Sequence, residues 1–261
     1  MSIAQTTSTP AVWDRVVCGI DLTPASVQAA LLAARLMPAT AQLTLCTVAS
    51  PEAVEGGVPL DKTLMREVKD GLDEVQGEVQ AFHDAELHLR EGPPIRRLLD
   101  ELSAERATLV ALGSQGHSRA AGIALGSVAT AMLHEAPCSV LIAHAEGSAD
   151  GEVVVGFDGS GGARRALEVG RELAGRLSLG LRVIVAAGDA HPPGPGWSRE
   201  ELGADLAVTE DPRPAVDALT DASASAGLLI LASRHLPGVM ALSSVSERVA
   251  HRASCPVLVA R

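Results

Sequence analysis

Two glycines three residues apart, followed ten residues later by a Gly-Ser pair, have a spacing that suggests chemistry. Gly113 and Gly116 follow the apolar run 109–112, and Gly126 and Ser127 open a segment that is predicted to be a helix. Glycine adopts positive φ freely and lets backbone N–H groups approach a ligand closely. The first turn of a helix adds unpaired N–H groups and the positive end of the helix dipole. This arrangement predicts an anion site that fits a phosphate.

Alternating strands and helices are predicted around this loop. Apolar runs of strand length occur at 16–21, 43–48, 109–113 and 139–144, and the segment 86–90 alternates polar and apolar residues as a strand does. Helical periodicity separates them at 23–36, 61–82 and 95–102, and again from 127. Such alternation indicates a doubly wound parallel sheet with helices on both faces. Ligands of these sheets bind outside the carboxyl ends of the strands, where Asp21, Val48 and Gly113 are expected to converge.

Two local signals sharpen the helix predictions. Thr23 and Pro24 supply an N-cap and a first-turn proline for the first helix. In the segment 61–82, apolar residues recur every three or four positions, which predicts one buried face. Phe82 is the last residue of that predicted face.

A resemblance to a known family rests on the glycine spacing together with residues downstream of it. These are Val128-Ala129 and the run 136–142, which reads Ala-Pro-Cys-Ser-Val-Leu-Ile. The set resembles the ATP-binding signature of the universal stress protein family. The resemblance implies a five-stranded, Rossmann-like sheet that binds an adenine nucleotide.

The resemblance also implies a role for individual residues. Asp21 and main-chain groups near Ile20 and Val48 would hold the adenosine, and the glycine loop with Ser127 would hold phosphates, with Mg²⁺ beside them. The full set of implied nucleotide-binding residues is Ile20, Asp21, Val48, Gly113, Ser114, Gly116, His117, Arg119, Gly126, Ser127 and Val128. No catalytic residue and no protein metal ligand is assigned.

Plainer explanations exist for several of these residues. The glycines could only shape a strand-to-helix connection, and Ser127 is an N-cap candidate in any case. Ser114 could donate to a phosphate or face water. Asp21 could be a helix-entry carboxylate stabilised by the helix dipole.

The second part of the chain repeats the first. Gly156, Asp158 and Ser160 follow Gly19, Asp21 and Thr23 at a constant displacement. The copies predict two tandem domains, at 13–146 and 151–261, after a flexible tail at 1–12.

The second copy is altered at the loop. Its residues in place of the glycines and the serine are Ala232, His235, Ser243 and Ser244, and its loop is two residues shorter. The stretch 188–196 is rich in proline and glycine and replaces the long amphipathic helix. A reduced second domain, with nucleotide bound mainly by the first, is therefore predicted.

Composition excludes other classes of function. The net charge of −11 without a Lys/Arg stripe argues against nucleic-acid binding, as does an aromatic content of 2%. No apolar run approaches the length of a membrane span, and the start of the chain lacks the features of a secretory signal, so a cytoplasmic protein is expected. The four cysteines lie mostly in apolar surroundings, which predicts buried, reduced thiols.

The leading hypothesis is an ATP-binding regulatory protein of the stress response. Two alternatives stay open, a slow ATP hydrolase and a nucleotide-independent assembly module. The chain has neither a phosphate-loop lysine motif nor a GxSxG or HExxH motif. The family resemblance further implies pairing through 139–144 and 256–261, either between the two halves or between two chains as a homodimer.

Overall fold

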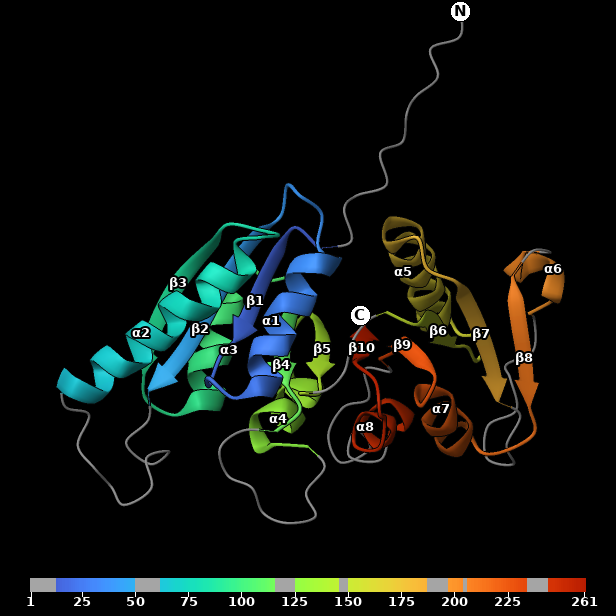
Figure 1. Cartoon of the computed structure of the whole chain (residues 1–261). Coiled ribbons are helices and arrows are strands. Elements are labelled where there is room, and N and C mark those ends of the chain that lie inside the picture. Colours follow the sequence, from blue (N-terminus) through green and yellow to red (C-terminus); the bar gives the residue numbers. More distant parts are fainter. Residues whose placement is uncertain are drawn as a thin grey trace, which may run out of the picture.

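The computed structural model describes most of the chain and is shown in Figure 1. The described residues are 13–49, 62–115, 125–145, 150–186, 197–203, 206–233 and 244–261, without the side chains of 62–65 and 200–201. The tail predicted at 1–12 lies outside them.

The elements alternate as predicted, in two successive halves. The first half contains β1 (Arg15–Gly19), α1 (Pro24–Leu36), β2 (Gln42–Ala49), α2 (Lys62–Val79), β3 (Ala85–Glu91), α3 (Pro94–Ala104), β4 (Leu109–Gly113), α4 (Ser127–Glu135) and β5 (Ser139–Ala143). The second half contains β6 (Glu152–Gly156), α5 (Gly161–Leu177), β7 (Leu181–Ala186), α6 (Arg199–Leu202), β8 (Ala207–Asp211), α7 (Ala215–Ser223), β9 (Ala226–Ala232), α8 (Val245–Ala250) and β10 (Val257–Ala260).

The ten strands form one sheet in the order β3-β2-β1-β4-β5-β10-β9-β6-β7-β8. Pairing is parallel within each half and antiparallel between β5 and β10, where Leu141 lies opposite Leu258. The strand order of each half is that of a doubly wound sheet, so the predicted fold class is confirmed. The predicted pairing of the two halves through their closing strands is also confirmed. We call this β5–β10 junction the seam.

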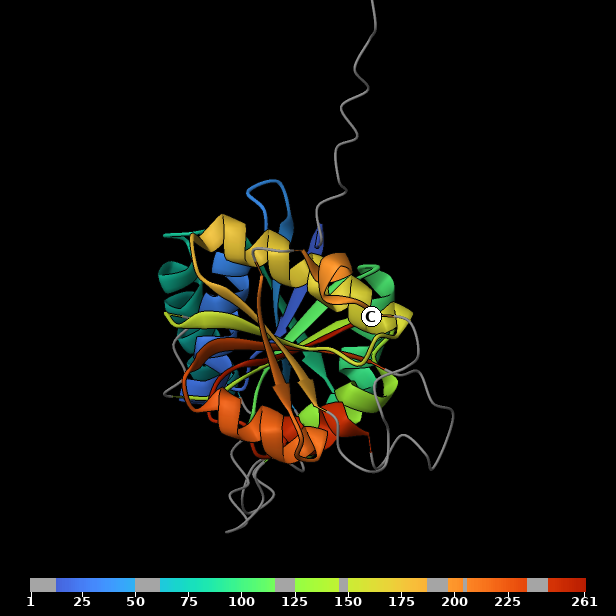
Figure 2. The same cartoon turned by 90° about the vertical axis from the view of Figure 1, so that its right-hand side faces the viewer.

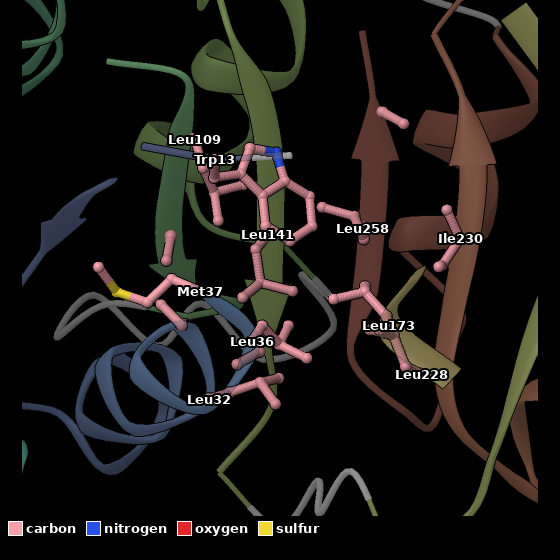
Figure 3. Packing of buried hydrophobic residues seen from close by; sticks show 14 of the residues in the cluster. Trp13, Leu32, Leu36, Met37, Leu109, Leu141, Leu173, Leu228, Ile230 and Leu258 are labelled. Carbon is pink, nitrogen blue, oxygen red and sulfur yellow. The ribbon is translucent and has the colours of Figure 1, made fainter. Parts of the chain in front are cut away.

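Helices cover both faces of the sheet (Figure 2). One buried cluster lies beneath α1, α2, α5 and α6, and the other lies beneath α3, α4, α7 and α8. The first cluster crosses the seam, because Leu36 and Leu141 share it with Leu173, Leu228 and Leu258 (Figure 3). The two halves therefore share a continuous core.

Local sequence signals place the helices well, with one exception. Thr23 is the N-cap of α1 and its side chain accepts a hydrogen bond from the Ser26 N–H, as predicted. Leu72 and Val79 of α2 are buried. Phe82, however, follows the end of α2 and is 51% exposed, so its predicted burial is wrong. The periodicity continues past the point where the chain turns towards β3.

The second half is reduced where the sequence predicted it. Between β7 and β8 the described residues contain only the four-residue helix α6, whereas α2 has 18 residues. The chain then enters the edge strand β8.

Candidate functional site

The carboxyl ends of β1, β2 and β4 lie at one edge of the first half, beside the start of α4. The Gly126 N–H donates to the Ser114 carbonyl over 2.7 Å, which joins the end of β4 to the beginning of α4. The Thr23 hydroxyl oxygen lies 3.4 Å from the Gln115 carbonyl oxygen, which places the β1 turn beside the same loop. The structure thus brings together the described residues of the predicted site.

The N-cap of α4 has no capping side chain. The residue is Gly126, which has no side chain to accept a hydrogen bond from the first turn. Ser127 is the first helical residue and is exposed, and Val128 is half-buried. The prediction of Ser127 as the N-cap is therefore wrong by one residue. An N-terminus without a side-chain cap, at a sheet edge, suits an anion.

The equivalent helix of the second half is capped differently. Ser244 is the N-cap of α8, and its hydroxyl accepts a hydrogen bond from the Glu247 N–H at 3.3 Å. A serine hydroxyl thus takes the place where an anion would bind α4. Among the residues that the structure describes, this is the clearest chemical difference between the two helix starts.

Asp21 closes a turn at the end of β1. One of its carboxylate oxygens accepts hydrogen bonds from the Thr23 N–H at 3.1 Å and from the Thr23 hydroxyl at 2.6 Å. Leu22 between them has a φ of 62°. Asp158 accepts from the Ser160 N–H at 3.0 Å in the same way. Turn closure is therefore common to both halves, and it leaves Asp21 half-buried at the edge where the site forms.

Ile20 and Val48 lie at adjacent strand ends. The Ile20 N–H donates to the Cys46 carbonyl, and the Ile20 carbonyl accepts from the Thr47 hydroxyl, both over 2.8 Å. The Ile20 side chain is buried, whereas Val48 is half-buried. The β1 end is thus rigidly fixed to the β2 end.

Gly113 has a packing reason to be glycine. A Cβ atom there would lie 2.7 Å from the backbone nitrogen of Ser26 and 2.8 Å from the carbonyl carbon of Ala25. In the second half the strand residue is Ala232 and the helix residue is Gly162, and a Cβ on Gly162 would lie 3.3 Å from the Ala232 Cβ. At this contact the glycine thus belongs to the strand in the first half and to the helix in the second. The replacement of Gly113 by alanine in the second copy is therefore no sign of a lost ligand.

The rest of the predicted loop divides between described and undescribed residues. Ser114 is only 4% exposed, so its alternative as a water-facing residue is wrong. Its backbone N–H donates to the Ala143 carbonyl over 2.7 Å. Gly116, His117 and Arg119 lie outside the described residues.

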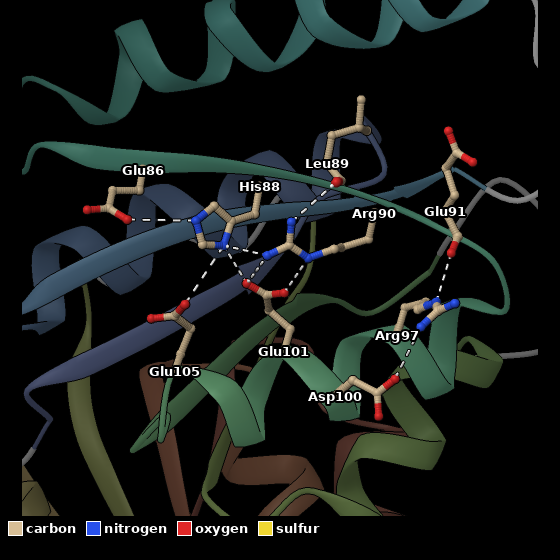
Figure 4. Close-up of polar contacts among 9 residues, drawn as sticks. All are labelled: Glu86, His88, Leu89, Arg90, Glu91, Arg97, Asp100, Glu101 and Glu105. Carbon is tan, nitrogen blue, oxygen red and sulfur yellow. Dashed lines mark hydrogen bonds and ion pairs between the residues drawn. The ribbon is translucent and has the colours of Figure 1, made fainter.

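A cluster of charged side chains between β3 and α3 did not emerge from the sequence (Figure 4). Glu101 is 3% exposed and binds both His88 and Arg90, whose Nε lies 2.7 Å from Oε2. Burial opposes the charged form of Glu101, but the hydrogen bonds from His88 and Arg90 outweigh it and lower its pKa. The sequence signal is the alternation of Glu86, His88 and Arg90, which predicts a strand but does not predict the helix residue that pairs with them.

The same cluster has the donor types of a metal site. His88, Glu101 and Glu105 offer ligand atoms within 4.8 Å of one another. The Arg90 guanidinium, however, lies 3.1 Å from Glu101 Oε1 and 3.2 Å from His88 Nδ1. Because this cation already neutralises the carboxylate, the arrangement is explained as an ion-pair network that anchors the edge strand β3 to α3.

The cysteines are buried thiols, as predicted. Cys18, Cys46, Cys138 and Cys255 are all free and buried. Cys46 lies beside His88 in the strand register. Burial, reinforced by Glu101, raises the pKa of Cys46 to about 12, so this pair lacks the thiolate that a nucleophile needs.

The second half has a cavity of its own on the α5 side. It measures about 420 Å³ and lies between α5 and α6, lined among others by Phe157, Arg164, Arg171 and Leu202. In the first half the corresponding side of α1 is covered by α2. Trp197 packs edge-on against Phe157, with ring centroids 6.3 Å apart. The cavity is explained by the short helix α6, which stands in the second half where the first half has the long helix α2.

The fold and the site define a tandem, doubly wound α/β protein with a candidate anion site in one half. The model of the universal stress protein family matches residues 13–144 and 204–261, so the chain belongs to this family, with two domains of which the second is shorter.

Relatives cover almost the whole chain. A universal stress protein of Mycobacterium tuberculosis is 30% identical over 94% of this chain and 96% of its own length. A solved universal stress protein of Archaeoglobus fulgidus has a TM-score of 0.72, with 22% identity over 96% of this chain and 97% of that one. Within the described part of the chain, no helix is both long and apolar enough to cross a membrane.

Proposed function

We propose that this universal stress protein binds ATP, together with Mg²⁺, at the carboxyl edge of its first half, and that it acts as a regulatory nucleotide sensor. The observation that carries the proposal is the start of α4, where Gly126 offers no side-chain cap and Ser127 is exposed. A phosphate would accept hydrogen bonds from the first-turn N–H groups and be stabilised by the helix dipole.

The neighbouring strand ends support an adenosine subsite. Asp21 is held by its turn, and the main chain around Ile20 is fixed to β2. These groups lie at the edge of the sheet that meets the α4 loop. Preorganised groups cost little ordering entropy on binding, which suits a regulatory ligand.

The second half is proposed to bind no nucleotide, because Ser244 caps α8 itself. We propose domain boundaries at 13–146 and 151–261 and a cytoplasmic location. The β5–β10 pairing joins the two halves of one chain as a pseudo-dimer. We therefore propose that a homodimer of two chains would form through other surfaces.

One substitution separates binding from folding. Gly126 has φ −70° and ψ 161°, an extended conformation that any residue adopts. In Gly126→Asp the new carboxylate would cap α4 and repel a phosphate at the same place. Calorimetric titration with Mg-ATP should show about one site per chain in the wild type and none in this variant.

Ser244→Asp is the matched control, because it alters the N-cap of the equivalent helix α8. It should leave ATP affinity and stoichiometry unchanged. Absence of ATP binding by the wild type would overturn the proposal and favour a nucleotide-independent assembly module. Binding that survives Gly126→Asp would also overturn it.

A further inference from the structure

Helix α4 has one end at the candidate nucleotide site and the other at the second half. Gly126 lies at its start, and His134 lies in its last turn. His134 Nε2 lies 3.2 Å from Glu247 Oε1, which belongs to α8 of the second half. Figures 1 and 2 show α4 and α8 on the same face of the sheet, beside the seam. A helix of nine residues thus connects the loop with the other half of the molecule.

The Glu247 side chain does not make the local contact that its sequence position predicts. The sequence Ser244-x-x-Glu247 is that of a capping box, in which the glutamate side chain returns to the N-cap N–H. Here the serine half of the box forms, but the glutamate side chain turns towards His134. Glu247 is only 8% exposed, and its Oε2 has no hydrogen-bond partner among the described residues. An unpaired buried carboxylate oxygen is costly, so its position needs an explanation.

A second residue of the second half holds the same end of α4. The Arg261 Nη2 donates to the carbonyl of Leu133 over 2.6 Å. Leu133 and His134 are consecutive residues in the last turn of the helix, where carbonyl groups lack helical partners. A cation there is favoured by the negative end of the helix dipole. Two charged residues from the second half therefore fix the last turn of α4.

We propose that Glu247 and Arg261 are positioning residues for the nucleotide site of the first half, acting through the last turn of α4. This inference rests on the proposed function. Displacement at one end of a short, rigid helix is transferred to the other end, where the first-turn N–H groups of Ser127 and Val128 lie at the proposed phosphate subsite. The second half thereby sets the affinity of a site to which it contributes no ligand contact.

The contact to test is the pair formed by Glu247 and His134. Glu247→Ala should weaken Mg-ATP binding roughly fivefold, and Glu247→Gln, which still hydrogen-bonds to His134, should restore it to within about twofold of wild type. In nucleotide-free protein, the amide cross-peaks of Gly126 and Ser127 should shift in Glu247→Ala and return in Glu247→Gln. A role confined to stability would leave those cross-peaks unchanged. Arg261→Met is the second variant, should Glu247→Ala fail to fold, and it should show the same two effects.

The control is a contact between the two halves on the opposite face of the sheet. Arg176 of α5 donates to the Leu36 carbonyl at the end of α1, and α1 and α5 cover a different core cluster from α4. Arg176→Gln should lower stability without changing ATP affinity or the Gly126 and Ser127 cross-peaks. Wild-type ATP affinity in Glu247→Ala, or an equal loss of affinity in Arg176→Gln, would overturn the inference while the proposed function stands. A wild-type protein that does not bind ATP would overturn the proposed function, and unshifted cross-peaks would overturn the inference independently.

Discussion

Gly113 lies against the first turn of α1, where a Cβ atom would come within 2.7 Å of the backbone nitrogen of Ser26. The second half solves the same contact by placing the glycine at Gly162 in the helix, opposite Ala232. One glycine is needed at each contact, and either partner can supply it. A residue type that marks ligand loops thus has a purely steric role at this position.

The contact predicts a compensating pair of substitutions. Gly113→Ala should lower the free energy of unfolding by about 1–3 kcal/mol, because backbone atoms cannot move aside as a flexible side chain can. Adding Ala25→Gly should recover part of the loss, because it removes the Ala25 Cβ, which would lie 3.0 Å from the new Cβ, and places a glycine in the helix as Gly162 does in the second half. Denaturant unfolding of the two single variants and the double variant measures the coupling. Strictly additive effects would contradict this account.

The start of α4 predicts a stabilising variant. Gly126→Asp should raise the free energy of unfolding by about 0.5 kcal/mol, because aspartate caps a helix better than glycine and interacts favourably with its dipole. Thermal unfolding without nucleotide measures the effect. Gly126→Asn carries the same shape without the charge and should show a smaller gain. A lower free energy of unfolding in Gly126→Asp than in the wild type would indicate that other atoms already occupy the space beside Gly126.

The Glu101 cluster predicts loss of stability in acid. The pKa of Glu101 in the folded protein lies below its ordinary value of about 4.3, so its contribution is present above that value and is lost as the pH falls through the folded pKa. Unfolding measured between about pH 5 and pH 3 should therefore show a smaller acid-dependent loss in Glu101→Gln than in the wild type. Glu78→Gln, at an exposed position of α2, serves as the control. Parallel pH curves for Glu101→Gln and wild type would contradict the prediction.

His144 predicts a second loss of stability at milder pH. It follows β5, its Nε2 is buried without a partner among the described residues, and burial lowers its pKa. The unfolded chain therefore binds a proton more readily, and stability is lost as the pH falls below the ordinary histidine value of about 6.5. His144→Leu should reduce the loss measured between about pH 7 and pH 5.5. His83, a half-buried histidine between α2 and β3, provides the control as His83→Leu.

The thiols should be inert in the native protein. Burial raises the pKa of Cys138 to about 11 and that of Cys255 to about 12, despite smaller opposing effects of neighbouring groups. Iodoacetamide at about pH 8 should label none of the four cysteines until the protein unfolds, because the reaction requires an accessible thiolate. Mass spectrometry of the labelled peptides checks this. Rapid labelling of any one of them would show that its strand opens locally.

The sequence predicted the fold well because the fold depends on local patterns. Strand-length apolar runs, Thr23 as an N-cap and the internal repeat all survive in the structure. The site was predicted only in part, since the need for glycine at 113 comes from a helix some 90 positions earlier in the chain. The network around Glu101 and the contact of Glu247 with His134 also join residues distant in sequence. No spacing rule reports such contacts, because they arise only when helices pack on the sheet.

The β5–β10 pairing has a consequence for how the two halves could diverge. Separate chains that meet through such strands come apart on dilution, whereas two halves of one polypeptide keep a high effective concentration of each other at any dilution. An assembly of identical chains must also carry every substitution twice. Here the N-cap of α8 is Ser244 whereas that of α4 is Gly126, so one half could lose an uncapped helix start without the other doing so. Covalent linkage thus converts a symmetric pair of domains into an asymmetric pair.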